Sequence, residues 1–261
     1  MIEDDVVKGS TARFGHSWNI FSEILPIHEE QFIRWTTGLS ASDFKGKSFI
    51  DVGCGIGRNS YWPFTYGAKS CLAIDLDERT LAVAKENLSS FKDAKVERRS
   101  AYEINEDEQF DIAFSIGVLH HVEEPDRALQ SMIKSVKPRG KVLAWLYGYE
   151  NNEKLVRYFN PFRKLLFSKL PLPVVFVFSA PLTLVLWCLL RVGLNRTQYL
   201  RLIRQFSFRH LRAIVYDHMV PRIAKYYKKE EARAFFEDAG LVNVEVHWVN
   251  EMSWTVIGTK K

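Results

Sequence analysis

The chain has 261 residues, a formal net charge of +5, 47% hydrophobic residues and three cysteines. This length can bury a substantial core, as one domain or as one domain with an insertion. Cys54, Cys71 and Cys188 have neither a paired nor a metal-ligand spacing, which argues against disulfides and structural zinc and favours a reducing, cytoplasmic setting. Residues 1–5 are acidic where a secretory signal needs a basic start, so we expect no signal peptide.

The first 45 residues are expected to form lead-in helices ahead of the core. Residues 13–24 are rich in aromatic side chains, including Phe14, Trp18 and Phe21. From their composition alone, these side chains are expected to pack on the face of a sheet.

Residues 49–60 form the most informative segment of the chain. An apolar strand end runs into Gly53, Gly55 and Gly57, and the start of a helix follows. Glycine lets the backbone approach a ligand where a Cβ would clash, and the helix start directs free N–H groups at the ligand's polar end. A dinucleotide fingerprint needs its third glycine at the position of Arg58, so this spacing disfavours a nicotinamide cofactor.

A second strand is predicted at residues 69–75, ending in Asp75 eighteen residues after Gly57. A carboxylate at this position can accept hydrogen bonds from both hydroxyls of a ribose, and Leu76 would then lie against an adenine face. Residues 77–88 place apolar side chains at helical spacing and are expected to form the next helix.

Two further strands are predicted downstream. Residues 109–122 have the composition of a buried parallel strand and end in His120 and His121, whereas residues 137–147 form a turn and a strand. A helix is expected to start around Pro125, between the two strands. This alternation of strands and helices is typical of a doubly wound parallel α/β sheet.

Residues 151–229 carry the basic charge of the chain. They contain fifteen lysines and arginines against two acidic residues, a net charge of +13, so the rest of the chain carries −8. Residues 171–190 contain no charge at all and are long enough to cross a bilayer. Because internal prolines break helices, we expect two short apolar helices separated near Pro181, as part of a helical cap over the sheet.

Three interpretations of this apolar run stay open: it is the cap's own core, a site for an apolar acceptor, or a contact with an anionic membrane face. Basic and aromatic side chains alternate at residues 199–212, a mixture that also suits nucleic acid. A charge-free run inside the basic patch disfavours that partner. The chain closes with an amphipathic helix at residues 230–240 and alternating strands at residues 242–249 and 253–258.

Several of these segments together resemble the class I S-adenosylmethionine-dependent methyltransferases. The resemblance covers about residues 45–148 and, more weakly, the last thirty or so. It implies a Rossmann-like, seven-stranded sheet with a C-terminal antiparallel hairpin, built from residues 46–150 and 230–261. The segments that carry it are Asp51-x-Gly53-x-Gly55-x-Gly57, Asp75, the strand at Phe110-Asp111 and Lys137-Pro-Arg-Gly140.

The same resemblance implies S-adenosylmethionine as the cofactor. Where relatives usually carry an acidic residue for the adenine amine, this chain has Ser100, whose hydroxyl can still form a hydrogen bond. A leading helix with Phe14 and Trp18 would close over the cofactor, and Tyr147, Tyr149 and His218 would face the acceptor. The residues assigned to the cofactor are Asp51, Gly53, Gly55, Gly57, Asp75, Leu76, Ser100, Ala101, Ile116 and His121.

The expected reaction is methyl transfer to an oxygen of an apolar or lipid-linked small molecule. A hydroxyl acceptor must lose its proton, and His120 and Asp217 are the expected bases because strand end and cap would meet there. For Asp217 the alternative is neutralisation of neighbouring arginines, and for His121 a backbone hydrogen bond beside the cofactor. We expect no metal site and no nucleic-acid partner.

Two rival functions stay open at this point. One is an NAD(P)-dependent oxidoreductase on a similar sheet. The other is a non-catalytic cofactor-binding protein that docks on a membrane or partner through its cap. The expected location is the cytoplasm, with peripheral contact of residues 151–229 on the inner face of the membrane.

Overall fold

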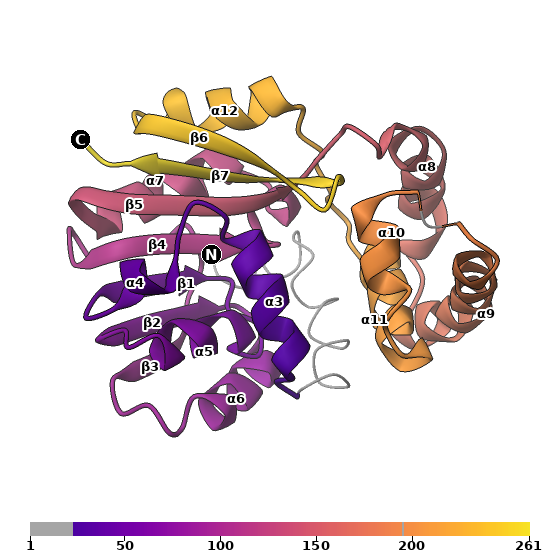
Figure 1. The fold of residues 1–261 in the computed structure, drawn as a ribbon, viewed down its shortest axis with the longest axis horizontal. Coiled ribbons are helices and arrows are strands. Elements are labelled where there is room, and N and C mark those ends of the chain that lie inside the picture. Colours follow the sequence, from indigo (N-terminus) through magenta and orange to yellow (C-terminus); the bar gives the residue numbers. More distant parts are fainter. Residues whose placement is uncertain (1–22, 195) are drawn as a thin grey trace.

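The computed structural model describes residues 23–194 and 196–261. Its core is one seven-stranded sheet with the strand order β3-β2-β1-β4-β5-β7-β6 (Figure 1). Neighbouring strands among β1 to β5 pair in parallel, while β7 pairs antiparallel with both β5 and β6. This arrangement confirms the predicted doubly wound sheet with its C-terminal antiparallel hairpin. The strands are β1 (Ser48–Val52), β2 (Ser70–Asp75), β3 (Ala94–Arg98), β4 (Phe110–Ile116), β5 (Val136–Tyr147), β6 (Val242–Val249) and β7 (Ser253–Thr259).

Helices cover both faces of the sheet, and each face has its own hydrophobic core. Side chains alternate between the two faces along a strand, so Phe49 of β1 packs against Phe44, whereas its neighbour Ile50 joins the opposite core with Leu129. One face is covered by α3 (Pro26–Trp35), α4 (Ala41–Phe44), α5 (Arg58–Thr65) and α6 (Glu78–Asn87). The other is covered by α7 (Pro125–Ser135) and α12 (Lys229–Glu237).

Between β5 and α12 the chain forms a separate helical cap beside the sheet, seen in orange and rose in Figure 1. Two small cores hold it together: one contains Val175 and Tyr216, the other Leu190, Ile203 and Leu211. The cap consists of the π-helical turns η2 (Leu155–Phe159) and η3 (Arg163–Phe167) and the helices α8 (Asn160–Phe162), α9 (Leu172–Arg191), α10 (Gln198–Ile203) and α11 (Phe208–Met219).

The prediction of two short apolar helices was wrong, because α9 is one helix that contains Pro181. A proline removes one helical hydrogen bond, and polar side chains stabilise the turn before it. Arg212 of α11 donates hydrogen bonds to the Phe176 carbonyl at 2.7 Å and to the Ser179 hydroxyl at 3.0 Å. Among the described residues, only α9 is long and apolar enough to cross a membrane by length and composition.

One boundary and one strand also differ from the sequence prediction. The strand expected at residues 109–122 ends at Ile116, because Gly117 turns the chain with a φ of 80°. The two histidines therefore lie in a separate 3₁₀ turn, η1 (Leu119–His121), rather than at a strand end. Strand β3 was not predicted, since its short, half-buried edge has no clear alternation of apolar and polar residues.

Candidate active site

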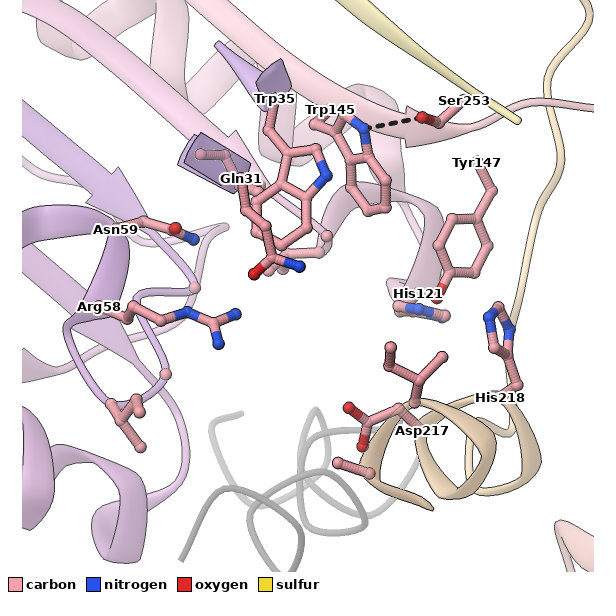
Figure 2. A pocket seen from close by; sticks show the side chains of 18 of the residues that line it. Gln31, Trp35, Arg58, Asn59, His121, Trp145, Tyr147, Asp217, His218 and Ser253 are labelled. Carbon is pink, nitrogen blue, oxygen red and sulfur yellow. Dashed lines mark hydrogen bonds between the residues drawn. The ribbon is translucent and has the colours of Figure 1, made fainter. Parts of the chain in front are cut away.

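A cavity of about 690 Å³ lies between the carboxyl ends of the strands, α3 and the cap (Figure 2). Ligands bind at this edge of open α/β sheets, where the strand order reverses. Asp51, Gly57, His120 and Tyr149 are not on its wall, while Phe14 and Trp18 fall outside the described residues. The predicted residues on the wall are Gly53, Gly55, Asp75, Leu76, Ser100, Ala101, Ile116, His121, Tyr147, Asp217 and His218.

The glycine loop follows β1 directly and is held from below by β2. The N–H groups of Gly53 and Cys54 both donate to the Ile74 carbonyl, at 2.8 and 2.9 Å. A Cβ on Gly53 would lie 2.3 Å from Val118, and the φ of 81° is unfavourable for other residues. At Gly55, whose φ is 54°, a Cβ would meet no atom of the described residues within 4 Å. Gly53 is therefore required by packing, whereas Gly55 borders open space in the cavity.

Asp75 organises the loop as well as lining the cavity. Its Oδ2 accepts a hydrogen bond from the N–H of Gly55 at 2.9 Å. Its Oδ1 accepts from Leu76 and Asp77, at 2.7 and 3.0 Å. Burial raises the pKa of Asp75, and these N–H groups oppose that shift. Because Oδ2 carries only this one bond from the loop, it can also accept a hydrogen bond from a ribose hydroxyl.

Asp51 lies beneath the loop rather than on the cavity wall. Its side chain is 1% exposed, and its Oδ2 accepts a 2.6 Å hydrogen bond from the Ser60 hydroxyl. Its Oδ1 has no hydrogen-bond partner within the part of the chain that the structure describes. Burial raises the pKa of Asp51 to about 7, the Ser60 hydroxyl opposes the shift and the charge of Asp75 adds to it. In this geometry Asp51 supports the loop through α5.

The wall nearest the cap carries aromatic rings and histidines (Figure 2). Nδ1 of His121 lies 2.6 Å from the Ile223 carbonyl, so Nδ1 carries the proton and Nε2 the lone pair. Burial lowers the pKa of His121 to about 3 and that of His218 to about 4, which leaves both rings neutral near pH 7. The ring of Tyr147 lies 5.7 Å from that of His218, and burial raises the pKa of Tyr147 well above its ordinary value.

His120, one of the two predicted bases, packs behind this wall. It is 1% exposed, and its ring centroid lies 3.9 Å from that of Tyr147 and 4.2 Å from that of His121. Burial lowers its pKa well below the ordinary value. Neither ring nitrogen has a hydrogen-bond partner among the residues described. An acceptor in the cavity meets His121 and Tyr147 before it meets His120.

Asp217 and Arg58 face the cavity from opposite sides (Figure 2). Asp217 comes from α11 in the cap, and Arg58 is the first residue of α5 after the glycine loop. Burial lowers the pKa of Arg58 to about 10, and the charge of Asp217 opposes that shift. The structure thus brings a carboxylate of the cap and a guanidinium of the core to one cavity.

Sequence reasoning missed several residues of the wall. Arg58 was noted only as an exception to a glycine pattern, although its place directly after the loop was the available signal. Gln31 and Trp35 are one turn apart on α3 and share the face turned to the cavity (Figure 2). Trp145 donates a hydrogen bond to the Ser253 hydroxyl at 3.0 Å, which joins β5 to β7 at the cavity edge. No group of three or more metal-ligating side chains occurs in residues 23–194 and 196–261.

Residues 50–144 match a family model described as a methyltransferase domain. Over 114 residues the chain is 33% identical to phosphoethanolamine N-methyltransferase 2 of Caenorhabditis elegans, covering 41% of this chain and 25% of that protein. Over 128 residues it is 33% identical to a ubiquinone biosynthesis O-methyltransferase of Pseudomonas putida, covering 48% of this chain and 55% of that protein. The chain thus spans about half or less of the length of these relatives.

The fold also resembles solved structures along most of the chain. A SAM-dependent methyltransferase from Aquifex aeolicus aligns with a TM-score of 0.56 at 17% identity, over 91% of this chain and 95% of that one. The matches favour a methyltransferase over the nicotinamide oxidoreductase. The cradle fits the cofactor of that family, since Gly55 borders open space and the Asp75 carboxylate faces the same cavity. Residues 50–144 are therefore assigned to a methyltransferase domain of the class I S-adenosylmethionine-dependent type, with S-adenosylmethionine as its cofactor.

Proposed function

We propose that this chain transfers a methyl group from S-adenosylmethionine to an oxygen of an apolar or lipid-linked small molecule. The observation that carries the proposal is the cavity, which joins the glycine loop at one end to the cap at the other. Its volume of about 690 Å³ is within the roughly 300–1,000 Å³ typical of ligand sites. The names of the two relatives specify different acceptor atoms, nitrogen and oxygen, so the choice of oxygen needs its own support.

The cap end of the cavity favours an apolar acceptor. Burial of apolar surface stabilises a bound acceptor by about 25 cal/mol per Å², whereas a strongly polar acceptor would lose hydration there. The apolar residues that the cap contributes to the wall are Leu155, Phe159, Leu182, Leu186, Leu200, Leu202, Ile203, Phe206, Ala213, Ile214, Val215 and Met219.

The main task of the protein is alignment in a dry cavity. The bound cofactor supplies an electrophilic methyl group on a sulfonium. The glycine loop and Asp75 hold the cofactor end of the cavity, while the apolar wall of the cap orients the acceptor and excludes water. Alignment of two reactants in this way can lower a barrier by about 7–11 kcal/mol.

Asp217 and His218 can take the proton of a hydroxyl group, and they therefore support methyl transfer to oxygen. Both lie on the wall, on the turn of α11 that faces the core (Figure 2). His218 is neutral because burial lowers its pKa to about 4, and a neutral ring can accept a proton. Tyr147 has a raised pKa and keeps its proton, so it can donate to the acceptor but not act as base. We assign the base to Asp217, with His218 beside it.

The experiment is single-turnover methyl transfer with methyl-labelled S-adenosylmethionine and separate lipid and water-soluble extracts. Label in the lipid fraction is the expected result. Asp217→Asn should lower the rate by about 10²–10⁴-fold with cofactor affinity nearly unchanged. His120→Asn is the control, because substitution of a packed residue should lower the thermal stability and the cofactor affinity of the protein together. If neither extract accepts label although the cofactor binds, the non-catalytic alternative is correct.

A near-normal rate for Asp217→Asn would contradict the choice of acceptor. Alignment would then suffice, and the nucleophile would arrive already deprotonated, as a carboxylate or free amine does. The methyltransferase assignment would survive that result, whereas the hydroxyl acceptor and the role of Asp217 would not.

A further inference from the structure

Helix α9 exposes a continuous apolar stripe along its whole length. Its exposed residues come in pairs about one turn apart, so they lie on one side of the helix. Val177 is 68% exposed and Val185 58%. Soluble proteins rarely leave such a patch uncovered unless it contacts a partner or a membrane. We call this the α9 stripe; its members are Val174, Val177, Phe178, Pro181, Leu182, Leu184, Val185, Cys188, Leu189 and Val192.

The stripe extends onto the preceding helical turns of the cap. Phe162 is half exposed and packs against Phe167, with ring centroids 5.3 Å apart. Phe178 of the stripe packs against the same Phe167 at 6.3 Å. In Figure 1 this part of the cap lies on the far side of α11 from the sheet. The apolar surface of α9 therefore continues onto the turns that precede it.

The charged side chains in the sequence on either side of α9 have one sign. No acidic residue occurs between Lys154 and Tyr216, whereas that interval contains eleven lysines and arginines. Lys164 and Lys169 are exposed just before α9, and Arg191 is exposed at its end. An apolar face bordered by cations complements a bilayer with anionic headgroups. A second copy of this chain would bring the same cations together, which disfavours self-association through this face.

The other side of α9 argues against a helix that spans a membrane. Val175, Ser179 and Thr183 are buried against the cap. Arg212 reaches the middle of α9 and donates to the Phe176 carbonyl and the Ser179 hydroxyl. A spanning α9 would place this guanidinium near the centre of the bilayer, which is costly.

We propose that the α9 stripe docks the chain on the surface of an anionic phospholipid bilayer, with the stripe in the interface and the flanking lysines and arginines on the headgroups. This inference is independent of the methyl-transfer proposal, because it concerns binding alone. Leu182 belongs to the stripe and also lines the cavity. One consequence follows from this contact, and it rests on the methyl-transfer proposal. An apolar acceptor could then pass from the bilayer to the cavity along α9.

Flotation of the full chain with vesicles tests the docking directly. The vesicles contain phosphatidylcholine alone or phosphatidylcholine with one third phosphatidylglycerol. We expect binding to the anionic vesicles that is much weaker on the neutral ones and fades with salt. Val177→Asp/Val185→Asp should weaken binding at least tenfold. Ile33→Asp is the matched control, because Ile33 is 55% exposed on α3 and does not belong to the α9 stripe.

A second pair of variants tests the cations. Lys164→Gln/Lys169→Gln should weaken binding to anionic vesicles by about fivefold for each lysine removed at low salt. Lys85→Gln/Lys92→Gln removes two exposed lysines near α6 and should change little. Thermal unfolding and cofactor binding should be unchanged in all of these variants, since none of the substituted residues lines the cavity.

Three results would overturn the inference. Equal binding of the Val177→Asp/Val185→Asp variant and the wild type would show that the stripe is not the contact. A wild-type dimer that this variant dissociates, without vesicle binding by either, would assign the stripe to a second copy of the chain. Protein that stays in the membrane after extraction with alkaline carbonate would make α9 a spanning helix.

Discussion

Removal of the Asp75 carboxylate should weaken cofactor binding through two contacts at once. The carboxylate faces the cavity, where a ribose can bind, and it also accepts hydrogen bonds from the N–H groups of Gly55, Leu76 and Asp77 at 2.7–3.0 Å. Asp75→Ala leaves those three N–H groups without their acceptor. The loop then loses the geometry that the glycines provide.

A hydrogen bond to a charged group contributes about 1.5–3 kcal/mol. Loss of the contact to the ribose alone therefore predicts a dissociation constant about tenfold to 150-fold higher. The N–H groups left without an acceptor should also lower the free energy of unfolding by about 1–3 kcal/mol. Asp75→Asn keeps one oxygen but points an amide at one of these donors, so it should rescue binding only in part.

Isothermal titration calorimetry with S-adenosylmethionine and its demethylated product measures the first effect, and urea unfolding measures the second. Glu78→Ala is the control, because Glu78 is a neighbouring exposed carboxylate that pairs with Arg98 at the surface. Its affinity should stay within about twofold of the wild type, since such pairs contribute little. An Asp75→Ala protein that binds the cofactor within threefold of the wild type would refute the reasoning. Binding of NADH in place of S-adenosylmethionine would overturn the cofactor itself.

Further predictions concern the loop and the pH dependence of stability. Gly53→Ala should cost more free energy of unfolding than Gly55→Ala, because only the first Cβ clashes, at 2.3 Å from Val118; Gly55→Ala should mainly weaken cofactor binding, and equal losses in urea unfolding would contradict this. His218 has a pKa of about 4 in the folded state and about 6.5 when unfolded, so the unfolded chain binds more protons between these values. Its contribution to stability is complete above pH 6.5 and is lost as the pH falls toward 4, by about 3 kcal/mol in total. Between pH 7.5 and 4.5, urea unfolding should show a smaller decrease in the free energy of unfolding for His218→Asn than for the wild type. Identical decreases would contradict the lowered pKa of His218 in the folded state.

Local sequence patterns were sufficient for the parallel core and its cofactor loop. Three glycines on alternate positions, a strand before them and Asp75 at the end of the next strand specify a cradle through spacing alone. The reason is that these contacts join the loop after β1 to β2, and the two strands are consecutive in the chain and adjacent in the sheet. Alternation predicted the two strands within residues 242–258, whereas their pairing as an antiparallel C-terminal hairpin was implied by the resemblance to the class I methyltransferases.

Tertiary structure decided which of the nominated side chains reach the cavity. His120 and His121 are adjacent in sequence, yet only His121 lines the wall, because Gly117 ends β4 and the following turn directs His120 behind Tyr147. Nothing in a two-residue pattern fixes that orientation. Asp51 likewise supports α5 through Ser60 instead of facing the cavity.

The cap shows most clearly which features the sequence predicts and which depend on tertiary contacts. Its composition indicated helices, basic charge and an apolar run, but the prolines predicted a break that does not occur. Arg212, 31 residues after Pro181 in the sequence, donates hydrogen bonds to the turn before the proline and packs α11 against α9. Contacts between distant segments also decided which side of α9 is buried and which is exposed, because a run that is apolar all round carries no periodic signal for either side.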